Sequence, residues 1–336
     1  MALMNHSFEL AARPVGLPKR TDWNFKETPV REPGADELLV KIIYISLDPA
    51  MRGWMNESRS YVPPVGIGEV MRALALGRVI ESRNPKFAAG EFVYGALGVQ
   101  EYAVSNGSGL TKVVPGAAPL SVYLGALGMT GMTAYFGLLE VGRPQPGETV
   151  VVSGAAGAVG SVAGQIAKIK ECHVVGIAGS AEKCDYVVKE LGFDAAINYK
   201  TEDVRKSLQN LCPKGISVYF DNVGGDILDA VLTQLARGAR IVICGAISQY
   251  NNTTRMKGPS NYMSLLVNRA SMTGMLVFDY AARFPEAARE MAKWMAEGKL
   301  KSREQIVEGL QTFPDTFLKL FAGENTGKLI LKVAEP

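Results

Sequence analysis

The second half of the chain alternates short apolar runs with segments whose apolar residues recur at helical spacing. The apolar runs predict strands at 150–154, 173–179, 195–199, 217–223, 239–246 and 272–278. The segments between the first five runs are each apolar on one face and predict helices at 157–170, 181–191, 202–211 and 226–236. This alternation is typical of a parallel sheet covered by helices on both sides, so the predicted fold class is α/β.

The first 120 residues follow a different pattern, in which β-branched runs are separated by Gly, Pro and Asn. The clearest predicted strand is 37–49, and further strands are predicted at 73–82, 91–97 and 99–105. Short strands at this spacing indicate a β-rich barrel or sandwich. At the other end of the chain, 281–300 predicts a helix, and the tail ends in a strand-like run that can return to the first domain.

Composition narrows the class of protein further. Of the 336 residues, 47% are hydrophobic, which is enough for two packed domains. The net charge is only +3, which argues against nucleic acid or an anionic membrane as a partner. Because the chain has no long apolar run and no secretory signal near its first residue, we expect a soluble, cytoplasmic protein.

A cluster of small residues stands where the first apolar run of the alternating region turns into a helix. Gly157 and Gly160 have the spacing of the last two glycines in G-x-G-x-x-G, with Ala155 in place of the first and Gly154 before it. Small residues let the backbone approach a pyrophosphate, and the N–H groups at the start of a helix attract its charge. Tight helix–strand packing is the alternative reason for glycine, but the β-α-β setting favours a dinucleotide site.

The end of the second apolar run bears on which dinucleotide binds. An NAD site usually has an acid there, bonded to the ribose 2′-hydroxyl. Here no acid ends the strand, and Ser180 and Lys183 stand where a 2′-phosphate would lie, while Glu182 is interpreted as a first-turn residue that favours the helix dipole. A hydroxyl and a cation suit a dianion, so the sequence favours NADP over NAD; the alternative for Lys183 is an ordinary solvated lysine.

Metal ligands are scarce in the sequence. No cysteine precedes Cys172, and the only histidines are His6, near the N-terminus, and His173, at the start of a predicted strand. We therefore predict no metal site. The four cysteines, which form no CxxC pair, are interpreted as reduced, buried thiols, with a regulatory thiol as the alternative. Without a Lewis acid, the chemistry shifts toward an acceptor that is already activated, such as a carbon–carbon double bond conjugated to a carbonyl.

Eight stretches, in order from residue 44 onward, together carry a resemblance to a known family. They are YISLDPAMRGWM (44–55), LGMTGMTAYFGLLEVG (127–142), GAAGAVGSVAGQIAK (154–168), GSAEKCDYV (179–187), GFDAAINYK (192–200), YFDNVGG (219–225), ICGAISQYN (243–251) and ENTGKLILKV (324–333). The chain resembles the zinc-independent medium-chain dehydrogenase/reductases, in particular the NADP-dependent alkenal/one oxidoreductases, which include prostaglandin reductases, plant double-bond reductases and bacterial curcumin reductases. The resemblance implies a Rossmann NADP-binding domain at 122–299 and a GroES-like, partly open barrel at 1–121 and 300–336 as the catalytic domain.

The resemblance also implies roles for individual residues. The pyrophosphate would lie on the turn at 157–160, the 2′-phosphate at Lys183 and Tyr199, and the adenosine ribose near Asn222. The nicotinamide and its ribose would lie beside backbone at 244–250 and 276–278, with Asn325 reaching the cofactor from the tail. The predicted cofactor-binding residues are Met129, Thr133, Gly157, Ala158, Val159, Gly160, Ser180, Lys183, Tyr199, Asn222, Cys244, Gly245, Ala246, Ile247, Ser248, Tyr250, Leu276, Val277, Phe278 and Asn325.

Tyr250 is the candidate catalytic residue, because a phenol can donate to the oxygen of a developing enolate at neutral pH. The alternative is a loop tyrosine that covers the cofactor. Tyr61 is a further candidate for contact with substrate; a structural role is the alternative for it, as for Arg52 and Trp54. Relatives often have tyrosine at the position of Ala50 and proline at that of Thr130, and both departures bear on the substrate more than on the reaction.

The predicted reaction is hydride transfer from NADPH to the β-carbon of an α,β-unsaturated ketone or aldehyde, which saturates the double bond. The resemblance implies a homodimer. A quinone reductase of the same superfamily is the nearest alternative. A non-catalytic NADPH-binding sensor or structural protein is the alternative from another class, and a zinc alcohol dehydrogenase is a third that the shortage of metal ligands disfavours.

Overall fold

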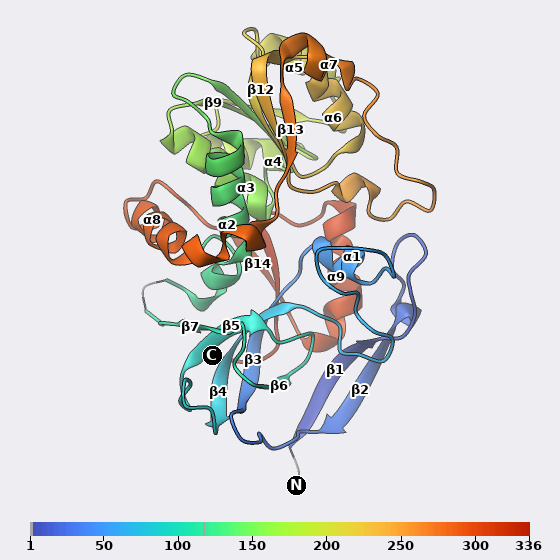
Figure 1. Cartoon of the computed structure of the whole chain (residues 1–336), viewed down its shortest axis with the longest axis vertical. Coiled ribbons are helices and arrows are strands. Elements are labelled where there is room, and N and C mark those ends of the chain that lie inside the picture. Colours follow the sequence, from blue (N-terminus) through green and yellow to red (C-terminus); the bar gives the residue numbers. More distant parts are fainter. Residues whose placement is uncertain (1–2, 117) are drawn as a thin grey trace. The chain divides into compact units, whose positions relative to one another are not determined.

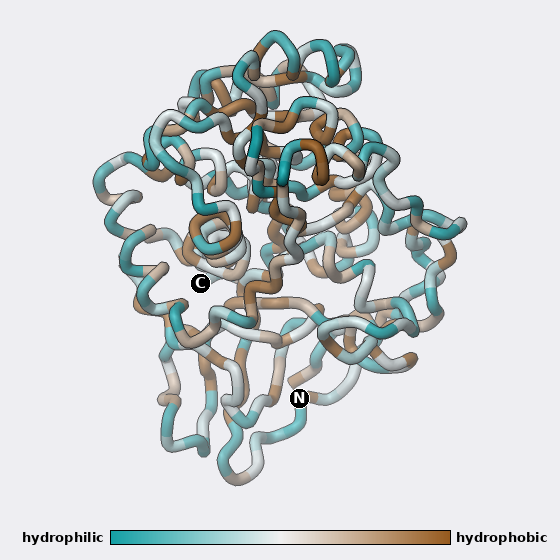
Figure 2. Tube along the Cα trace, turned by 45° about the horizontal axis from the view of Figure 1, so that its top comes forward, coloured by the Kyte–Doolittle hydropathy of each residue, from teal (hydrophilic) through white to brown (hydrophobic). Residues whose placement is uncertain are grey.

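The chain folds into two compact units. The computed structural model describes residues 3–116 and 118–336. Unit 1 takes in Met1–Leu124 and Glu304–Pro336, and unit 2 is Gly125–Arg303 (Figure 1). In Figure 2 the hydrophobic positions, in brown, gather inside the units, and the hydrophilic positions lie mostly on outer loops. The assignment of catalysis to one part of the chain and NADP binding to the other remains a prediction.

Unit 2 is built on a six-stranded parallel sheet with the strand order β10-β9-β8-β11-β12-β13. The first strand along the chain, β8, lies between β9 and β11. The chain therefore adds β9 and β10 on one side of β8 and then adds β11, β12 and β13 on the other side. Sheets of this kind bind ligands at such a switch point, beyond the carboxyl ends of the strands. The strands are β8 (Thr149–Ser153), β9 (His173–Ala178), β10 (Ala195–Asn198), β11 (Ile216–Asp221), β12 (Leu235–Ile243) and β13 (Ser271–Gly274).

The six strands occur where the apolar runs predict them, but the fourth, fifth and sixth runs extend past the strand ends at Asp221, Ile243 and Gly274, and β12 begins inside the helix predicted at 226–236. Met275 N still donates to Ile243 O at 3.1 Å, and Val277 then begins a helical turn, Val277–Arg283. The chain leaves the sheet there because its pairing partner β12 ends at Ile243, which lies opposite Gly274. Val277 and Phe278 therefore belong to a turn and not to a strand.

Helices cover both faces of this sheet, which confirms the predicted arrangement (Figure 1). On one face Val151 of β8 belongs to a buried cluster with Leu208 and Val231. On the other face a Cβ on Gly137 would lie 2.8 Å from the Phe220 ring, so this segment packs directly on β11. The helices are α2 (Met129–Phe136), α3 (Ala158–Ile169), α4 (Ala181–Asp185), α5 (Val204–Leu211), α6 (Gly225–Leu232), α7 (Met263–Asn268) and α8 (Phe284–Ala296).

Unit 1 contains a seven-stranded, mainly antiparallel sheet and a two-stranded sheet that pairs β1 with β2. The larger sheet has the order β14-β15-β3-β4-β5-β7, with β6 also paired to β3, and over the described residues of this unit it does not close into a barrel. The tail returns to this unit, since β15 pairs with β3. The elements are β1 (Met4–Leu10), β2 (Trp23–Pro29), β3 (Leu38–Ser46), α1 (Ala50–Trp54), β4 (Leu74–Ser82), β5 (Phe92–Ala96), β6 (Tyr102–Ser105), β7 (Thr111–Val113), β14 (Glu304–Glu308), α9 (Phe313–Ala322) and β15 (Lys328–Lys332).

Two buried cations hold the motif stretches of unit 1 in place. Lys328 Nζ donates to Asp48 Oδ1 at 2.6 Å and to Leu47 O at 2.8 Å, which ties the start of β15 to the end of β3. The guanidinium of Arg52 is buried against backbone carbonyls, with Nη2 bonded to Gly16 O at 3.0 Å. Both side chains have their partners inside the unit, and Arg52 has the structural role that was the alternative for it.

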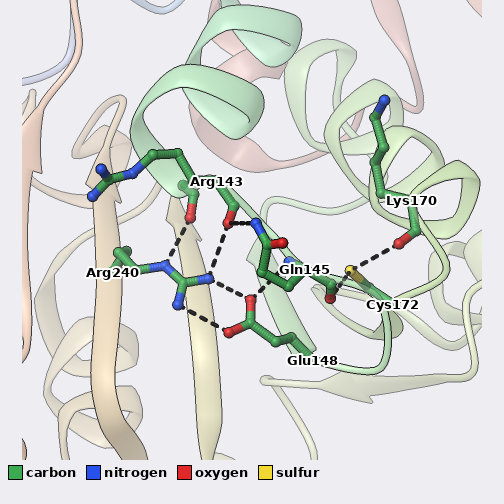
Figure 3. Close-up of polar contacts among 7 residues, drawn as sticks. Arg143, Gln145, Glu148, Lys170, Cys172 and Arg240 are labelled. Atoms are coloured by element: carbon green, nitrogen blue, oxygen red, sulfur yellow. Dashed lines mark hydrogen bonds and ion pairs between the residues drawn. The ribbon is translucent and has the colours of Figure 1, made fainter.

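A polar cluster stabilises the turn that leads into β8 (Figure 3). Arg240 Nη1 donates to Glu148 Oε1 at 3.0 Å, and Gln145 N donates to the same carboxylate at 2.9 Å. Cys172 Sγ lies 3.4 Å from Gln145 O, and burial raises the pKa of this thiol to about 11. The thiol therefore stays protonated at neutral pH, as a structural cysteine does.

Candidate cofactor-binding site

The glycine turn between β8 and α3 has the backbone geometry of a phosphate cradle. Gly154 has a φ of +60°, so it supplies the left-handed residue that the tight turn requires. Ala155 follows with its N–H bonded to Ile177 O at 3.1 Å, and Gly157 N donates to Gly154 O at 2.9 Å. Alanine can stand at the first position of the motif because Gly154 carries the strained conformation instead.

The last glycine of the motif is required for close packing. A Cβ on Gly160 would lie 2.3 Å from Gly154 O, so no larger residue fits while the turn keeps its shape. Ala158, Val159 and Gly160 are the first residues of α3, whose N–H groups have no carbonyl partner one turn earlier in the helix. These groups make the start of α3 suited to an anion, as the sequence predicts.

A cationic cluster lies at the carboxyl ends of β9 and β10. Ser180 caps α4, accepting from Lys183 N at 3.2 Å. The ring of Tyr199 lies over Gly179, where an added Cβ would be 2.9 Å from Tyr199 Cε1. Burial and the nearby charge of Lys200 lower the pKa of Lys183, while the charge of Glu182 acts in the opposite direction. Ser180, Lys183 and Tyr199 thus come together, and the structure adds Lys200, which the sequence reasoning missed although it follows Tyr199 directly.

The loops after β11 and β12 form the third part of this edge. Asn222 Nδ2 donates to Ser153 O at 2.7 Å, and Asn222 O accepts from Ile247 N at 3.2 Å. Ser248 Oγ donates to Val223 O at 2.6 Å. The two loops are therefore joined, and predicted residues from both lie on the same edge of the sheet as the glycine turn. These residues are Asn222, Cys244, Gly245, Ala246, Ile247, Ser248 and Tyr250.

The side chain of Tyr250 turns back over its own loop. Its Oη accepts a hydrogen bond from Ala246 N at 3.1 Å. A Cβ on Gly245 would lie 2.8 Å from the same oxygen, so glycine at 245 makes room for the phenol. A phenol that accepts one hydrogen bond can still donate its own proton, which is the role predicted for Tyr250. Burial also raises the pKa of the Cys244 thiol to about 12, so this thiol stays protonated at neutral pH.

The remaining predicted residues lie in α2, in the segment that follows the carboxyl end of β13, or in the other unit. Met129 and Thr133 lie in α2, where Thr133 Oγ1 donates to Met129 O at 2.8 Å. Leu276 precedes the turn that holds Val277, which is buried, and Phe278, which is 43% exposed. In unit 1, Asn325 Nδ2 donates to Gly327 O at 3.1 Å, and Tyr61 Oη accepts from Trp54 Nε1 at 3.2 Å. Contact of these residues with cofactor or substrate stays a prediction.

Neither histidine belongs to a cluster of metal ligands. His6 Nδ1 lies 2.8 Å from Glu101 Oε2, and His173 Nε2 lies 3.2 Å from Leu211 O. Over residues 3–116 and 118–336, no group of three or more His, Cys, Asp and Glu is placed to hold a metal ion. In the same part of the chain, every helix is too short or too polar to cross a membrane.

Comparison with known proteins gives two family matches and close relatives over nearly the whole chain. Residues 6–113 match an N-terminal domain of oxidoreductases, and residues 158–296 match a domain described as zinc-binding dehydrogenase. The NADPH-dependent curcumin reductase of Escherichia coli is 43% identical over 335 residues, which cover 98% of this chain and 97% of the relative. The chain belongs to the zinc-independent medium-chain dehydrogenase/reductase family.

Two further members of the family bear on chemistry and on the cofactor. The NADP-dependent 2-alkenal reductase of Nicotiana tabacum is 41% identical over 326 residues, with 95% of each chain covered. The crystal structure of CurA from Vibrio vulnificus in complex with NADPH has a TM-score of 0.94 and 43% identity, and covers 98% of this chain and 100% of that one. The family and fold expected from the motifs are thus confirmed.

Proposed function

We propose that the protein is an NADPH-dependent reductase of the carbon–carbon double bond of α,β-unsaturated ketones and aldehydes. The observation that carries the proposal is full-length similarity to a curcumin reductase and a 2-alkenal reductase. The cationic cluster at Lys183 supports the choice of NADPH, because a 2′-phosphate would relieve the repulsion between Lys183 and Lys200. In this proposal 122–299 binds NADP(H), and 1–121 with 300–336 completes the catalytic domain.

In this proposal, different residues at the carboxyl edge of the sheet bind different parts of NADPH. The first N–H groups of α3, at 158–160, bind the pyrophosphate, and Gly154 keeps the turn beneath them tight. Lys183 and Tyr199 bind the 2′-phosphate. Asn222 holds the adenosine ribose, and the loop at 244–248 lies along the nicotinamide ribose. These residues fit the nucleotide, since a cation, aligned amides and small residues are what a phosphorylated dinucleotide requires.

Tyr250 stabilises charge on the substrate. When bound, NADPH would supply the hydride for the β-carbon, and negative charge would then develop on the carbonyl oxygen. Tyr250 donates a hydrogen bond to that oxygen as negative charge develops there. The hydrogen bond from Ala246 N to Tyr250 Oη, 3.1 Å long, orients the phenol for this role. A proton from water or from Tyr250, added at the α-carbon, completes the saturated product.

An NADPH-oxidation assay across enals, enones and quinones, with identification of the products, tests the proposal. We expect saturated ketones and aldehydes as products. Loss of one donor to an oxyanion costs about 10²-fold in turnover, so Tyr250→Phe should reduce the rate by about that factor. Tyr262→Phe, which alters an exposed tyrosine of the same unit, is the matched control and should retain full activity. Turnover of quinones alone would make the protein a quinone reductase, and NADPH binding without oxidation would make it a sensor.

We also propose that two copies associate through the edge of the six-stranded sheet. β13 is an edge strand, and beside it α7 exposes Leu266 and Val267, which are 70% and 64% exposed. Antiparallel pairing of β13 with its copy would cover both the strand edge and these side chains. Light scattering should give about twice 36.1 kDa, and Leu266→Glu should give the monomer mass. A monomeric wild type would refute the association.

A cytoplasmic location is the last part of the proposal. Cys172, Cys184, Cys212 and Cys244 are all free thiols, which fits a reducing compartment. Cell fractionation with a soluble marker enzyme tests the location, and recovery outside the cytoplasmic fraction would contradict it.

A further inference from the structure

Asp221 is a buried carboxylate at the carboxyl edge of the six-stranded sheet. It is not among the residues proposed to bind NADPH or substrate. Asp221 is the last residue of β11 and is 1% exposed. Burial raises the pKa of this carboxyl, and the hydrogen bonds that it accepts act in the opposite direction. Burying a charged carboxylate costs several kcal/mol unless hydrogen bonds to it offset the loss of water. The hydrogen bonds that Asp221 accepts must therefore provide this compensation.

Four donors converge on a single oxygen of this carboxylate. Asp221 Oδ1 accepts from Tyr219 Oη at 2.9 Å and from Ser153 Oγ at 3.1 Å. It also accepts from Val223 N at 3.0 Å and from Gly224 N at 2.8 Å. A neutral amide oxygen has less charge to attract four donors at once, so the carboxylate is the side chain best suited to this position.

These contacts stabilise the turn that leads into α6. Gly224 and Gly225 have φ values of +68° and +57°, and two successive glycines in this region are costly in conformational entropy. The bonds from Val223 N and Gly224 N to Asp221 fix the start of that turn. Without the carboxylate, the buried N–H of Gly224 and the part-buried N–H of Val223 would lose their acceptor, which is unfavourable enough to rearrange the turn.

The same carboxylate acts on Asn222 through Ser153. Ser153 Oγ donates to Asp221 Oδ1 and accepts from Asn222 N at 3.0 Å, so Asp221 orients the hydroxyl for this bond. The side-chain amide of Asn222 is then held by Ser153 O at 2.7 Å. The backbone of Asp221 also bonds the next loop, since its carbonyl accepts from Cys244 N at 2.9 Å and from Gly245 N at 3.0 Å.

We propose that Asp221 is a positioning residue for NADPH, which sets the shape of the 222–225 turn and the orientation of Asn222 for the adenosine ribose. The inference rests on the proposed function in one respect, namely that Asn222 contacts the nucleotide. Asp221 lies on β11, whereas the cluster around Lys183 lies beyond β9 and β10. Loss of Asp221 should therefore weaken NADPH and NADH equally, unlike loss of a residue that binds the 2′-phosphate.

Equilibrium titration of the purified full chain with NADPH and with NADH, followed by fluorescence and without any enone, tests the inference. For Asp221→Ala we expect both dissociation constants to rise by about tenfold, which corresponds to the loss of one or two buried hydrogen bonds. The ratio of the two constants should stay within twofold of wild type. At saturating NADPH the kcat with an enone should change by less than about threefold, so the effect appears in the KM for NADPH.

Two further variants separate positioning from general stability. Asp221→Asn keeps an acceptor and most of the shape, so it should recover part of the affinity; it also serves as the test if Asp221→Ala does not fold. Glu148→Gln removes a carboxylate from the amino edge of the same sheet, where it binds Arg240. This control should lower the melting temperature without changing either dissociation constant.

The inference is overturned if folded Asp221→Ala, or Asp221→Asn in its place, binds NADPH within twofold of wild type. It is also overturned if Glu148→Gln weakens binding as much as the Asp221 variants, because the effect would then follow stability alone. A wild type that binds NADPH but reduces no enone would refute the proposed function and leave the inference about Asp221 testable by the same titrations.

Discussion

The glycine turn supports a quantitative prediction for Gly160→Ala. The new Cβ would lie 2.3 Å from Gly154 O, 2.9 Å from Gly154 C and 3.0 Å from Ala155 Cα. All three atoms belong to backbone, so no flexible side chain can move aside. Ordinary contact requires about 3.4 Å or more, and α3 and the turn must therefore separate by about 1 Å.

The cost divides between stability and affinity. Overpacking of this kind costs about 1–3 kcal/mol, while alanine in a helix gains about 1 kcal/mol over glycine. The net destabilisation is therefore about 0–2 kcal/mol, or a few degrees in melting temperature. The affinity for NADPH falls as well, because the start of α3, which moves away from the turn, carries the N–H groups of residues 158–160. If two charge-assisted hydrogen bonds weaken by about 1 kcal/mol each, the dissociation constant for NADPH rises by about 10- to 100-fold.

Titration with NADPH and thermal unfolding measure the two effects separately. Gly53→Ala is the matched control, since Gly53 lies in α1 and nothing lies within 4 Å of a Cβ there. The control should be neutral or slightly stabilising, with unchanged NADPH affinity. A Gly160→Ala protein that binds NADPH as tightly as wild type would refute the assignment of the pyrophosphate to this turn.

Three further predictions concern charged and titratable groups. Lys183→Ala should raise the dissociation constant for NADPH about 10- to 100-fold and leave that for NADH unchanged in paired titrations. Because the pKa of Lys183 is lowered, its ammonium is lost at a lower pH than that of an ordinary lysine, so NADPH affinity should fall with rising pH in wild type and much less in the variant. Lys328→Met should lower the free energy of unfolding in urea by about 3 kcal/mol, since it leaves Asp48 without its buried cation, and adding Asp48→Asn should restore part of the loss. Cys212 has its pKa raised to about 12 by burial, so a thiol reagent at pH 8 should not modify it before the protein unfolds, and mass spectrometry of the native protein should find it unmodified.

The nucleotide-binding half was readable from local pattern for a physical reason. A parallel sheet covered on both faces requires uninterrupted apolar runs, and Val150, Val151 and Val152 are all fully buried. The small residues at 154–160 are imposed by contacts within one turn, so they are visible as a motif without knowledge of the rest of the fold. The order of the motifs along the chain then indicated the family, and the comparisons confirm that family.

Other features of the fold could not be predicted because they depend on contacts between residues far apart in the sequence. The strand β14 was not predicted because three of its five residues are polar and it pairs with β15, and the helix α9 was not predicted because its aromatic residues pack on distant residues such as Phe8 and Trp23. From the local sequence, Lys328 would be read as a surface lysine. Only the fold brings Asp48, far away along the chain, next to it. Local sequence shows which side chains are available, and it does not show which of them share a buried space.

The candidate site shows the same division. The glycine spacing and the missing acid after β9 point to a phosphorylated dinucleotide because each depends on neighbours along the chain, whereas the role of Tyr199 came from the resemblance. That Asp221 accepts a hydrogen bond from Ser153, and that Asn222 O accepts one from Ile247 N, depends on loops from separate strands meeting at one edge. Hydrogen bonds between such loops follow from the strand order of the sheet, and strand order arises from packing that no short stretch of sequence contains.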